Sequence, residues 1–386
     1  MKKQNKKLKI AFVCIYSYPS ICGVWSRVYS LSQMLIEKGH EVHVFSTNVI
    51  KGTDKESCDF EIHEKINIHR FKPYFSFGEN LKFWNFFSQL KELNPDIIIA
   101  EVYRHPHTAL ALKVAKKLKK PIFLTTHAPF VEPELRSRLG NFLSNFYDKF
   151  YGRRTLSRFE KILTITKWEL PFLQKIGIDK KKLVYIPNGI PKEFFTIKKK
   201  EGHGLLFLGR IAPVKNLETL IAAVAIVSKK YPLIELKLVG PAEQDYKEKL
   251  ESMIKTLNLQ NNIQFIPAIY DLKKKINMID KSAIFILPSK REAMPQSLIE
   301  TMARRKIVIA SNNKGASEII NNKKSGFIFS TYNSERLAEL LLFCLDKRNK
   351  SRLDKIREQA FLKSTNFKWK TIFEEFYKLF LKYAKK

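Results

Sequence analysis

Residues 283–304, AIFILPSKREAMPQSLIETMAR, join a short apolar run to a longer amphipathic one. The apolar run at 283–288 has the length of a buried strand, and residues 296–304 follow a helical pattern. Pro295 suits the first turn of that helix, where its missing N–H costs nothing. The stretch therefore predicts a strand, a polar loop and a helix, which is the repeating unit of a parallel α/β sheet.

The same alternation extends along the chain in both directions. Strands are expected at 8–15, 41–47, 96–101, 121–126 and 161–166, and again at 205–208, 234–239, 263–267, 283–288 and 307–310, with helices between them. A chain of 386 residues is long enough for two cores. We expect two parallel α/β domains, at 1–190 and 191–366, with the charged stretch 198–202 as a hinge. Residues 367–386 predict an amphipathic helix that packs on a core.

The composition is strongly basic. The formal net charge is +33, from 70 Lys and Arg against 37 Asp and Glu, and the excess is spread over both halves. Such a field attracts nucleic acid, an anionic membrane face or phosphorylated ligands. A solvated, lysine-rich surface explains the same composition, so both interpretations stay open here.

Cysteine spacing and hydropathy indicate the compartment. Cys14, Cys22, Cys58 and Cys344 have neither zinc-ligand nor redox spacing, which favours free thiols in a reducing environment. No apolar run approaches the roughly 20 residues that cross a bilayer. The run after the basic N-terminus is too short for a secretory signal. We expect a cytoplasmic protein, or one on the membrane face that borders the cytoplasm.

Two cations follow the strand expected at 205–208. Neither a G-x-G-x-x-G nor a P-loop follows a strand, so phosphate must be bound in another way. Gly209 allows a ligand to approach the backbone. Arg210 offers a planar fork for phosphate oxygens, and Lys215 a mobile point charge. The pair suits a diphosphate, although two solvated surface charges would give the same pattern.

Two carboxylates flank the helix that begins near Pro295. The N–H groups of Gln296, Ser297 and Leu298 would form an anion site at the helix start. Glu300 has the chemistry to accept hydrogen bonds from both hydroxyls of a ribose, and Glu292, in the loop, would lie nearer a transferred sugar. Two unrelated surface glutamates are the alternative.

Three further positions come from strand ends and turns. His127 ends the strand expected at 121–126, where a single histidine is commonly structural. Gly23 precedes the first helix and leaves room for a backbone N–H to approach a ligand. Asn188-Gly189 marks a tight turn between the two blocks.

Taken together, these stretches resemble glycosyltransferase family 4, the retaining group 1 enzymes of the GT-B fold. The likeness covers most of the chain in the right order. The segments that carry it are Gly23, Lys38–Val42, His127, Ile186–Gly189, Gly209-Arg210, Lys215-Asn216, Val239–Pro241 and the Glu-x7-Glu pair at Glu292 and Glu300.

The resemblance implies two Rossmann-like domains that face each other across a cleft, with the C-terminal helix returning to the N-terminal domain. It implies retaining transfer from a nucleoside-diphosphate sugar, UDP or GDP, without a cofactor or an obligatory metal. The leaving phosphate would take the acceptor proton. His127 and Glu292 would be catalytic. The donor would be bound by Gly23, Gly209, Arg210, Lys215, Gly240, Ala293, Met294, Pro295, Gln296, Ser297, Leu298 and Glu300.

The chain departs from the family pattern at several positions. Cys22 replaces one of two glycines in the first loop. Arg305 and Ile307 stand where the family has Gly and Pro, and Gly315 is followed by Ala316 where a second Gly is common. These changes leave the donor and the shape of the sugar pocket open.

The acceptor would be a glycan or a lipid-linked or other cell-envelope intermediate. Residues 71–78 and 135–158 mix aromatic and basic side chains, and the second stretch predicts a helix. That helix either lies on an anionic bilayer or packs on the core with a basic outer face, and we favour core packing. A basic nucleic-acid-binding protein and a sugar phosphorylase of the same fold are the other functions considered. No nucleic-acid-binding signature and no pyridoxal-type lysine site supports them.

Overall fold

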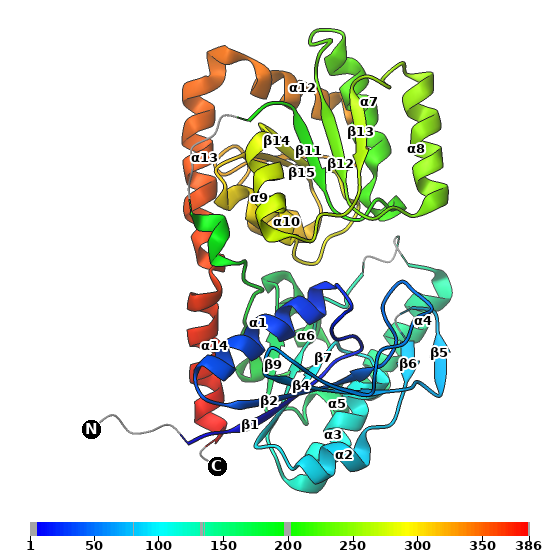
Figure 1. The fold of residues 1–386 in the computed structure, drawn as a ribbon, viewed down its shortest axis with the longest axis vertical. Coiled ribbons are helices and arrows are strands. Elements are labelled where there is room, and N and C mark those ends of the chain that lie inside the picture. The colour runs from blue at the N-terminus through cyan, green and yellow to red at the C-terminus, as the bar shows by residue number, and fades with distance from the viewer. Residues whose placement is uncertain (1–5, 80, 132–133, 135, 197–201, 385–386) are drawn as a thin grey trace, which may run out of the picture. The chain divides into compact units, whose positions relative to one another are not determined.

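The computed structural model describes residues 6–79, 81–131, 134, 136–196 and 202–384. The chain forms two compact units: residues 1–188 with 370–386 form unit 1, and residues 189–369 form unit 2. Both contain mainly parallel sheets with helices, as expected (Figure 1). Of the stretch expected to be a hinge, Lys198–Glu201 lies outside the described residues.

The sheet of unit 1 has eight strands in the order β10-β9-β8-β7-β1-β2-β4-β3. All neighbours pair in parallel except β3 with β4. Its strands are β1 Lys9–Val13, β2 Glu41–Thr47, β3 Phe60–His63, β4 Ile66–Phe71, β7 Ile97–Glu101, β8 Ile122–Thr125, β9 Lys161–Thr164 and β10 Leu183–Tyr185, and β5 Phe75–Phe77 pairs separately with β6 Leu81–Phe83. The chain runs outward from β1 and then returns to β7 on its other side. The strand order therefore reverses between β1 and β7, the kind of place where such sheets bind ligands.

Helices cover this sheet, and the C-terminal helix is one of them. They are α1 Gly23–Glu37, α2 Phe87–Leu93, α3 Pro106–Leu118, α4 Arg138–Tyr147, α5 Arg153–Leu156, α6 Leu170–Lys175 and α14 Trp369–Ala384; Asp148–Gly152 is a π-turn between α4 and α5. Tyr377 of α14 bonds the ring of His40 (2.8 Å), and Phe380 stacks on Phe123 with ring centroids 5.1 Å apart. The C-terminal helix thus packs on unit 1, as predicted.

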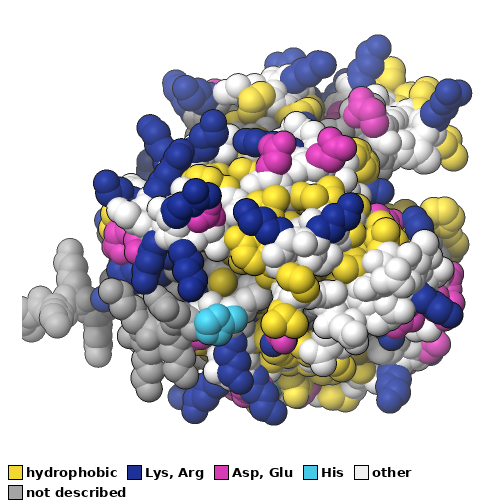
Figure 2. Space-filling view, turned by 90° about the horizontal axis from the view of Figure 1, so that it is seen from above, with side chains coloured by type: hydrophobic (Ala, Val, Ile, Leu, Met, Phe, Trp, Pro, Cys, Tyr) yellow, Lys and Arg dark blue, Asp and Glu magenta, His cyan; other side chains and the backbone are white. Residues whose placement is uncertain are grey.

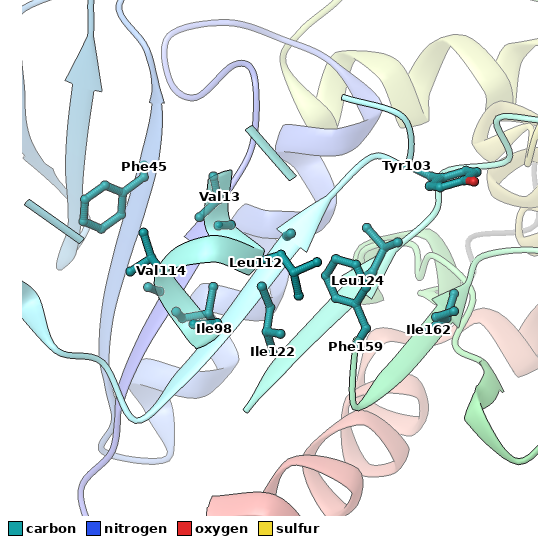
Figure 3. Packing of buried hydrophobic residues seen from close by; sticks show 14 of the residues in the cluster. Val13, Phe45, Ile98, Tyr103, Leu112, Val114, Ile122, Leu124, Phe159 and Ile162 are labelled. Atoms are coloured by element: carbon teal, nitrogen blue, oxygen red, sulfur yellow. The ribbon is translucent and has the colours of Figure 1, made fainter. Parts of the chain in front are cut away.

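The core of unit 1 lies between this sheet and its helices (Figure 3). Val13, Ile98 and Leu124 come from the strands, and Val114 comes from α3; all four are fully buried. The strands are apolar on both faces, as expected for a parallel sheet covered on both sides. This packing fixes the strand ends from which the candidate site is built.

Unit 2 repeats the architecture with six parallel strands in the order β13-β12-β11-β14-β15-β16. The strands are β11 Leu205–Leu208, β12 Leu236–Val239, β13 Ile263–Ile266, β14 Ile284–Leu287, β15 Ile307–Ser311 and β16 Phe327–Phe329. The helices are α7 Leu217–Ser228, α8 Gln244–Thr256, α9 Leu272–Lys281, α10 Gln296–Ala303, α11 Lys314–Ile319, α12 Ser334–Leu345 and α13 Lys350–Ser364. The strand order reverses between β11 and β14. The loops that carry Arg210, Lys215 and Glu292 follow these two strands.

Basic side chains are spread over the surface. Figure 2 shows Lys and Arg side chains distributed across the whole visible face, with acidic ones among them. The basic side chains on this face are therefore dispersed and do not form one basic patch.

Candidate active site

Two predicted donor glycines, at the ends of β11 and β12, fit against each other. Gly240 has a φ of +150°, and a Cβ there would lie 2.0 Å from the carbonyl oxygen of Gly209. The backbone binds across the same point, because the Gly209 N–H donates to the Val239 carbonyl (2.9 Å). Only glycine fits at position 240, since a backbone carbonyl cannot move aside as a flexible side chain can. This close packing sets the direction in which the Arg210 loop leaves the sheet.

The structure joins Lys215 to Glu292, one member of each predicted pair. Lys215 Nζ lies 2.6 Å from Glu292 Oε1, and both side chains are largely buried. Ser289 Oγ donates to the same oxygen (2.6 Å). The two loops are also tied by their backbones, through the Lys290 N–H and the Val214 carbonyl (2.8 Å). An ion pair between groups 77 residues apart therefore holds the β11 and β14 loops together.

Arg210 pairs with a different acid, Glu243, and not with Glu292. Its guanidinium is half-exposed and lies 3.2 Å from Glu243. A surface pair of this kind is weak and easily exchanged. Arg210 can therefore turn to an anionic ligand at little cost, whereas Lys215 is already held in place.

Glu300 projects from α10 into a buried contact with Lys275 of α9. Lys275 Nζ donates to Oε1 (2.8 Å) and lies 2.6 Å from Oε2. Despite that proximity, Oε2 accepts no hydrogen bond of good geometry and is shielded from solvent. Lys275 also lies over the ring of Phe194. Both oxygens of Glu300 therefore lie within ion-pair distance of the Lys275 ammonium.

Helix α10 begins at Gln296, as expected, and Pro295 lies one residue before its first turn. Pro295 is the N-cap of α10, with φ −73° and ψ 99°, and Gln296 is the first helical residue. The N–H groups of the helix's first turn have no intrahelical acceptor, and the N-cap side chain does not bond to them. Gly315 of α11 backs this loop, because a Cβ there would lie 2.6 Å from the carbonyl oxygens of Glu292 and Ala293.

In unit 1, His127 is bonded to a buried acid that the sequence did not single out. Its Nε2 lies 2.5 Å from Oε2 of Glu101, the fully buried last residue of β7. A carboxylate only accepts hydrogen bonds, so Nε2 is the donor in this contact and Nδ1 is left for another partner. Burial lowers the pKa of nearby His105 to about 4 and that of His107 to about 3. These two imidazoles are therefore neutral at physiological pH.

A second buried acid, Glu169, fixes the loop around His127. His127 and Ala128 both adopt left-handed backbone conformations, with φ of +57° and +52°. Glu169 accepts hydrogen bonds from the Thr126 hydroxyl and from the Ala128 N–H (2.9 Å). Burial raises the pKa of its carboxyl. These bonds hold both neighbours of His127 and keep its ring beside Glu101. Arg27, also fully buried, adds a positive charge near both acids.

The first loop of unit 1 accommodates its departure from the family pattern. Cys22 is the N-cap of α1, and its sulfur accepts from the Trp25 N–H (3.5 Å). A Cβ at Gly23 would meet no protein atom within 4 Å. Packing in the protein therefore does not require glycine at position 23.

Arg305 occupies the position where the family has glycine and keeps a glycine-like backbone. Its φ is +55°. The side chain binds Glu358 (2.8 Å) and stacks on Phe361, with 3.7 Å between the guanidinium carbon and the ring centroid. Contacts with α13 thus offset the strain of a left-handed arginine. Ile307, in place of proline, is the fully buried first residue of β15.

Two family models match adjoining parts of the chain. The model described as Glycosyltransferase Family 4 matches residues 21–194, and the one described as Glycosyl transferases group 1 matches residues 190–362. The chain belongs to the group 1 glycosyltransferases of the GT-B fold. It is a transferase.

Similar proteins span nearly the whole enzyme. An uncharacterized glycosyltransferase of Methanocaldococcus jannaschii is 26% identical, over 97% of this chain and 98% of that protein. The phosphatidyl-myo-inositol mannosyltransferase of Mycolicibacterium smegmatis is 22% identical, over 88% and 85%. The structure of Anabaena HepE in complex with UDP and glucose shares the fold, with a TM-score of 0.76 at 16% identity over 97% of this chain and 100% of that one.

Other features bear on ligands of this glycosyltransferase. Within the described ranges, no three His, Cys, Asp or Glu side chains converge as metal ligands would. Nor does any helix in that part of the chain have the length and hydropathy of a membrane crossing. A cavity of about 910 Å³ opens where β8 begins, lined by Lys113, Lys116, Lys119, Lys120 and Arg158 among others, and includes none of the predicted donor residues.

Proposed function

We propose that the enzyme transfers a sugar, with retention of configuration, from a UDP- or GDP-sugar to a cell-envelope acceptor. The observation that carries this proposal is the placement of Lys215 and Glu292 at the point where the strand order of unit 2 reverses. The likeness to HepE, whose structure contains UDP and glucose, supports a nucleotide-sugar donor.

The donor diphosphate would be bound by Arg210, Lys215 and the N–H groups that begin α10. As the bond from the sugar C1 to the diphosphate oxygen breaks, negative charge grows on the leaving group. Fixed cations and amide dipoles stabilise that charge more strongly than the ground state. Lys215 is preorganised for this role because Glu292 and the β11 loop already hold it.

The remaining contacts would position the nucleoside and the sugar. Glu300, whose carboxylate now pairs with Lys275, would bind the ribose hydroxyls once Lys275 shifts. Glu292 would contact the sugar hydroxyls from unit 2. From unit 1, His127 would contact a sugar hydroxyl through Nδ1, because Glu101 occupies Nε2.

The transfer step would occur on one face of the sugar. The acceptor oxygen forms its bond to C1 on the side from which the diphosphate leaves, and the acceptor proton passes to the leaving phosphate oxygen. This step is balanced without an enzyme nucleophile, a cofactor or a metal ion.

The acceptor is proposed to be a glycan or a lipid-linked intermediate at the cytoplasmic face of the membrane. A relative of known specificity, the mycobacterial phosphatidyl-myo-inositol mannosyltransferase, is named for a lipid acceptor. The exposed aromatic residues of unit 1 also support an acceptor at a membrane surface.

Thermal-shift measurements with UDP, GDP, ADP and their sugars test the donor. A ligand present at 100 times its dissociation constant should stabilise the fold by about 2.7 kcal/mol. Glu300→Ala and Arg210→Ala should weaken the response, whereas Arg336→Ala, on the exposed surface of α12, should leave it unchanged. No stabilisation by any nucleotide, or unchanged affinity in both site variants, would contradict the proposed donor site.

A further inference from the structure

Helix α4 of unit 1 exposes its apolar side chains. None of its residues is buried. Our expectation that this helix packs on the core is therefore wrong for its apolar face. The side chains concerned, on α4 and the following π-turn, are between 46% and 67% exposed: Leu139, Phe142, Leu143, Phe146, Phe150 and Tyr151.

These apolar residues are arranged as one continuous stripe. Leu139, Phe142, Leu143 and Phe146 have the i, i+3, i+4, i+7 spacing that lines one side of a helix. The ring centroids of Phe142 and Phe146 are 6.2 Å apart, and those of Phe146 and Phe150 are 4.6 Å apart. The aromatic rings therefore contact one another in sequence and not the core.

The opposite side of the helix is anchored, so the stripe cannot roll inward. Asp148 accepts from the Tyr103 hydroxyl (2.9 Å) and binds Arg104. Tyr147 packs edge-on against Tyr103. Gly152 is buried, and a Cβ there would lie 2.7 Å from the Tyr103 hydroxyl oxygen. The backbone is thus fixed with its apolar stripe facing outward.

The charges that border the stripe are of one sign. The exposed cations of α4 and of the residues that follow it directly are Arg138, Lys149, Arg153 and Arg154, whereas Arg158 lines the cavity at the start of β8. In residues 136–158 the acidic side chain is Asp148, which Arg104 neutralises. An exposed apolar stripe bordered by unpaired positive charge complements a surface that is apolar inside and anionic outside.

We propose that α4 and the π-turn after it form a docking surface for an anionic lipid bilayer. The apolar stripe inserts below the headgroups, and the flanking arginines bind lipid phosphates. This surface would bring unit 1 to a lipid-linked acceptor. That role rests on the proposed function. A nucleic acid would satisfy the cations but not Leu139 and Leu143. The uniform positive border also does not match a second copy of this basic chain, because like charges would face each other.

Vesicle sedimentation tests the docking surface. The full chain should pellet with vesicles of phosphatidylcholine and phosphatidylglycerol, and far less with phosphatidylcholine alone. Phe142→Ser combined with Phe146→Ser should lower partitioning about tenfold or more, because two rings that would insert into the bilayer are lost. Arg153→Gln with Arg154→Gln should weaken binding mainly at low salt, where charges act at longest range.

Leu233→Ser provides the matched control. Leu233 lies in unit 2 and is 94% exposed, so its loss removes an exposed apolar side chain outside α4. It should pellet as the unaltered chain does. All variants should keep the far-ultraviolet circular dichroism spectrum and the nucleotide-induced thermal shift, which separates a failure of docking from a failure of the donor site.

Three outcomes would overturn the proposal. One is no pelleting with anionic vesicles at low salt. Another is equal pelleting by the double phenylalanine variant and the unaltered chain. The third is a phenylalanine variant that binds vesicles as the unaltered chain does but differs from it in another property. That property would be the oligomeric state, measured by light scattering, or the affinity for a single-stranded oligonucleotide.

Discussion

At the scale of single residues, two glycines with the same predicted role differ in whether the protein's own packing requires glycine. Gly240 is enforced by the protein, because a Cβ would collide with the Gly209 carbonyl. Gly23 faces open space. The sequence shows two glycines with the same predicted role, and only the structure separates the one that packing requires from the one that packing leaves free.

Alanine substitution at these two glycines should separate the roles. Gly240→Ala should lower the free energy of unfolding by at least about 2 kcal/mol, since the backbone must move. Gly23→Ala begins a helix without a clash and should change stability by less than about 1 kcal/mol. If the donor approaches the backbone at Gly23, the alanine variant should bind nucleotide more weakly than the unaltered protein, even though its stability is little changed. Urea unfolding and nucleotide titration measure the two effects; unchanged nucleotide affinity would exclude Gly23 from the donor site.

Arg305 allows the strain of a left-handed arginine to be weighed against its contacts. Arg305→Ala keeps the strained backbone, costing about 1 kcal/mol, and loses the stacking on Phe361 and the pair with Glu358. Arg305→Gly loses the same contacts but relieves the strain. We therefore expect the alanine variant to be the least stable of the three proteins and the glycine variant to lie close to the unaltered one. An alanine variant as stable as the glycine variant would show that position 305 carries no strain.

His107 should make stability depend on pH. Burial lowers its pKa from 6.5 to about 3, so the folded chain keeps it neutral while the unfolded chain takes up a proton below pH 6.5. Its stabilising contribution is complete above that pH and is lost as pH falls from 6.5 towards 3. The loss is on the order of 1 kcal/mol per pH unit.

Urea unfolding across this pH range, with His107→Gln for comparison, measures the dependence. Glutamine can still donate to the Glu101 carbonyl, which the His107 ring now contacts at 2.6 Å, but it does not titrate. Its stability should fall less steeply towards acid pH. Parallel curves for the two proteins would assign the acid sensitivity to other groups, such as His69, whose pKa burial lowers to about 4.

At the scale of elements, the C-terminal helix α14 is part of the core of unit 1. Phe380 is fully buried and stacks on Phe123 of β8. Phe380→Ala should lower the free energy of unfolding by about 3–5 kcal/mol through lost burial and a cavity. Lys378→Ala, exposed on the same helix, should have an effect below about 0.5 kcal/mol. Similar effects from both variants, measured in urea, would mean that α14 is not a core element.

Elements were largely predictable from sequence, while partners were not. Apolar runs and helical spacing are local, so the strands at β11 and β14 and the helix α10 followed from the residues near them. Lys215–Glu292 and His127–Glu101 join residues 77 and 26 positions apart. Their contact depends on which strands are neighbours, which a local pattern does not encode. Lys275 and Glu169 were missed for the same reason, and α4 was assigned to the core because an amphipathic pattern does not say what its apolar side faces.

At the scale of the whole molecule, a surplus of 33 positive charges favours an anionic donor even without a metal ion. A diphosphate leaving group needs positive charge close to its oxygens. Arg210, Lys215 and the first turn of α10 supply it from the protein in the proposed site. We therefore expect sugar transfer to continue at an unchanged rate in EDTA, with no gain from added Mg²⁺ or Mn²⁺. Lys215→Ala should lower kcat more than it raises the KM for the donor, since Lys215 acts on charge that develops in the transition state. A loss of activity in EDTA that Mg²⁺ restores would show that these groups do not suffice and that a metal ion shares the diphosphate charge.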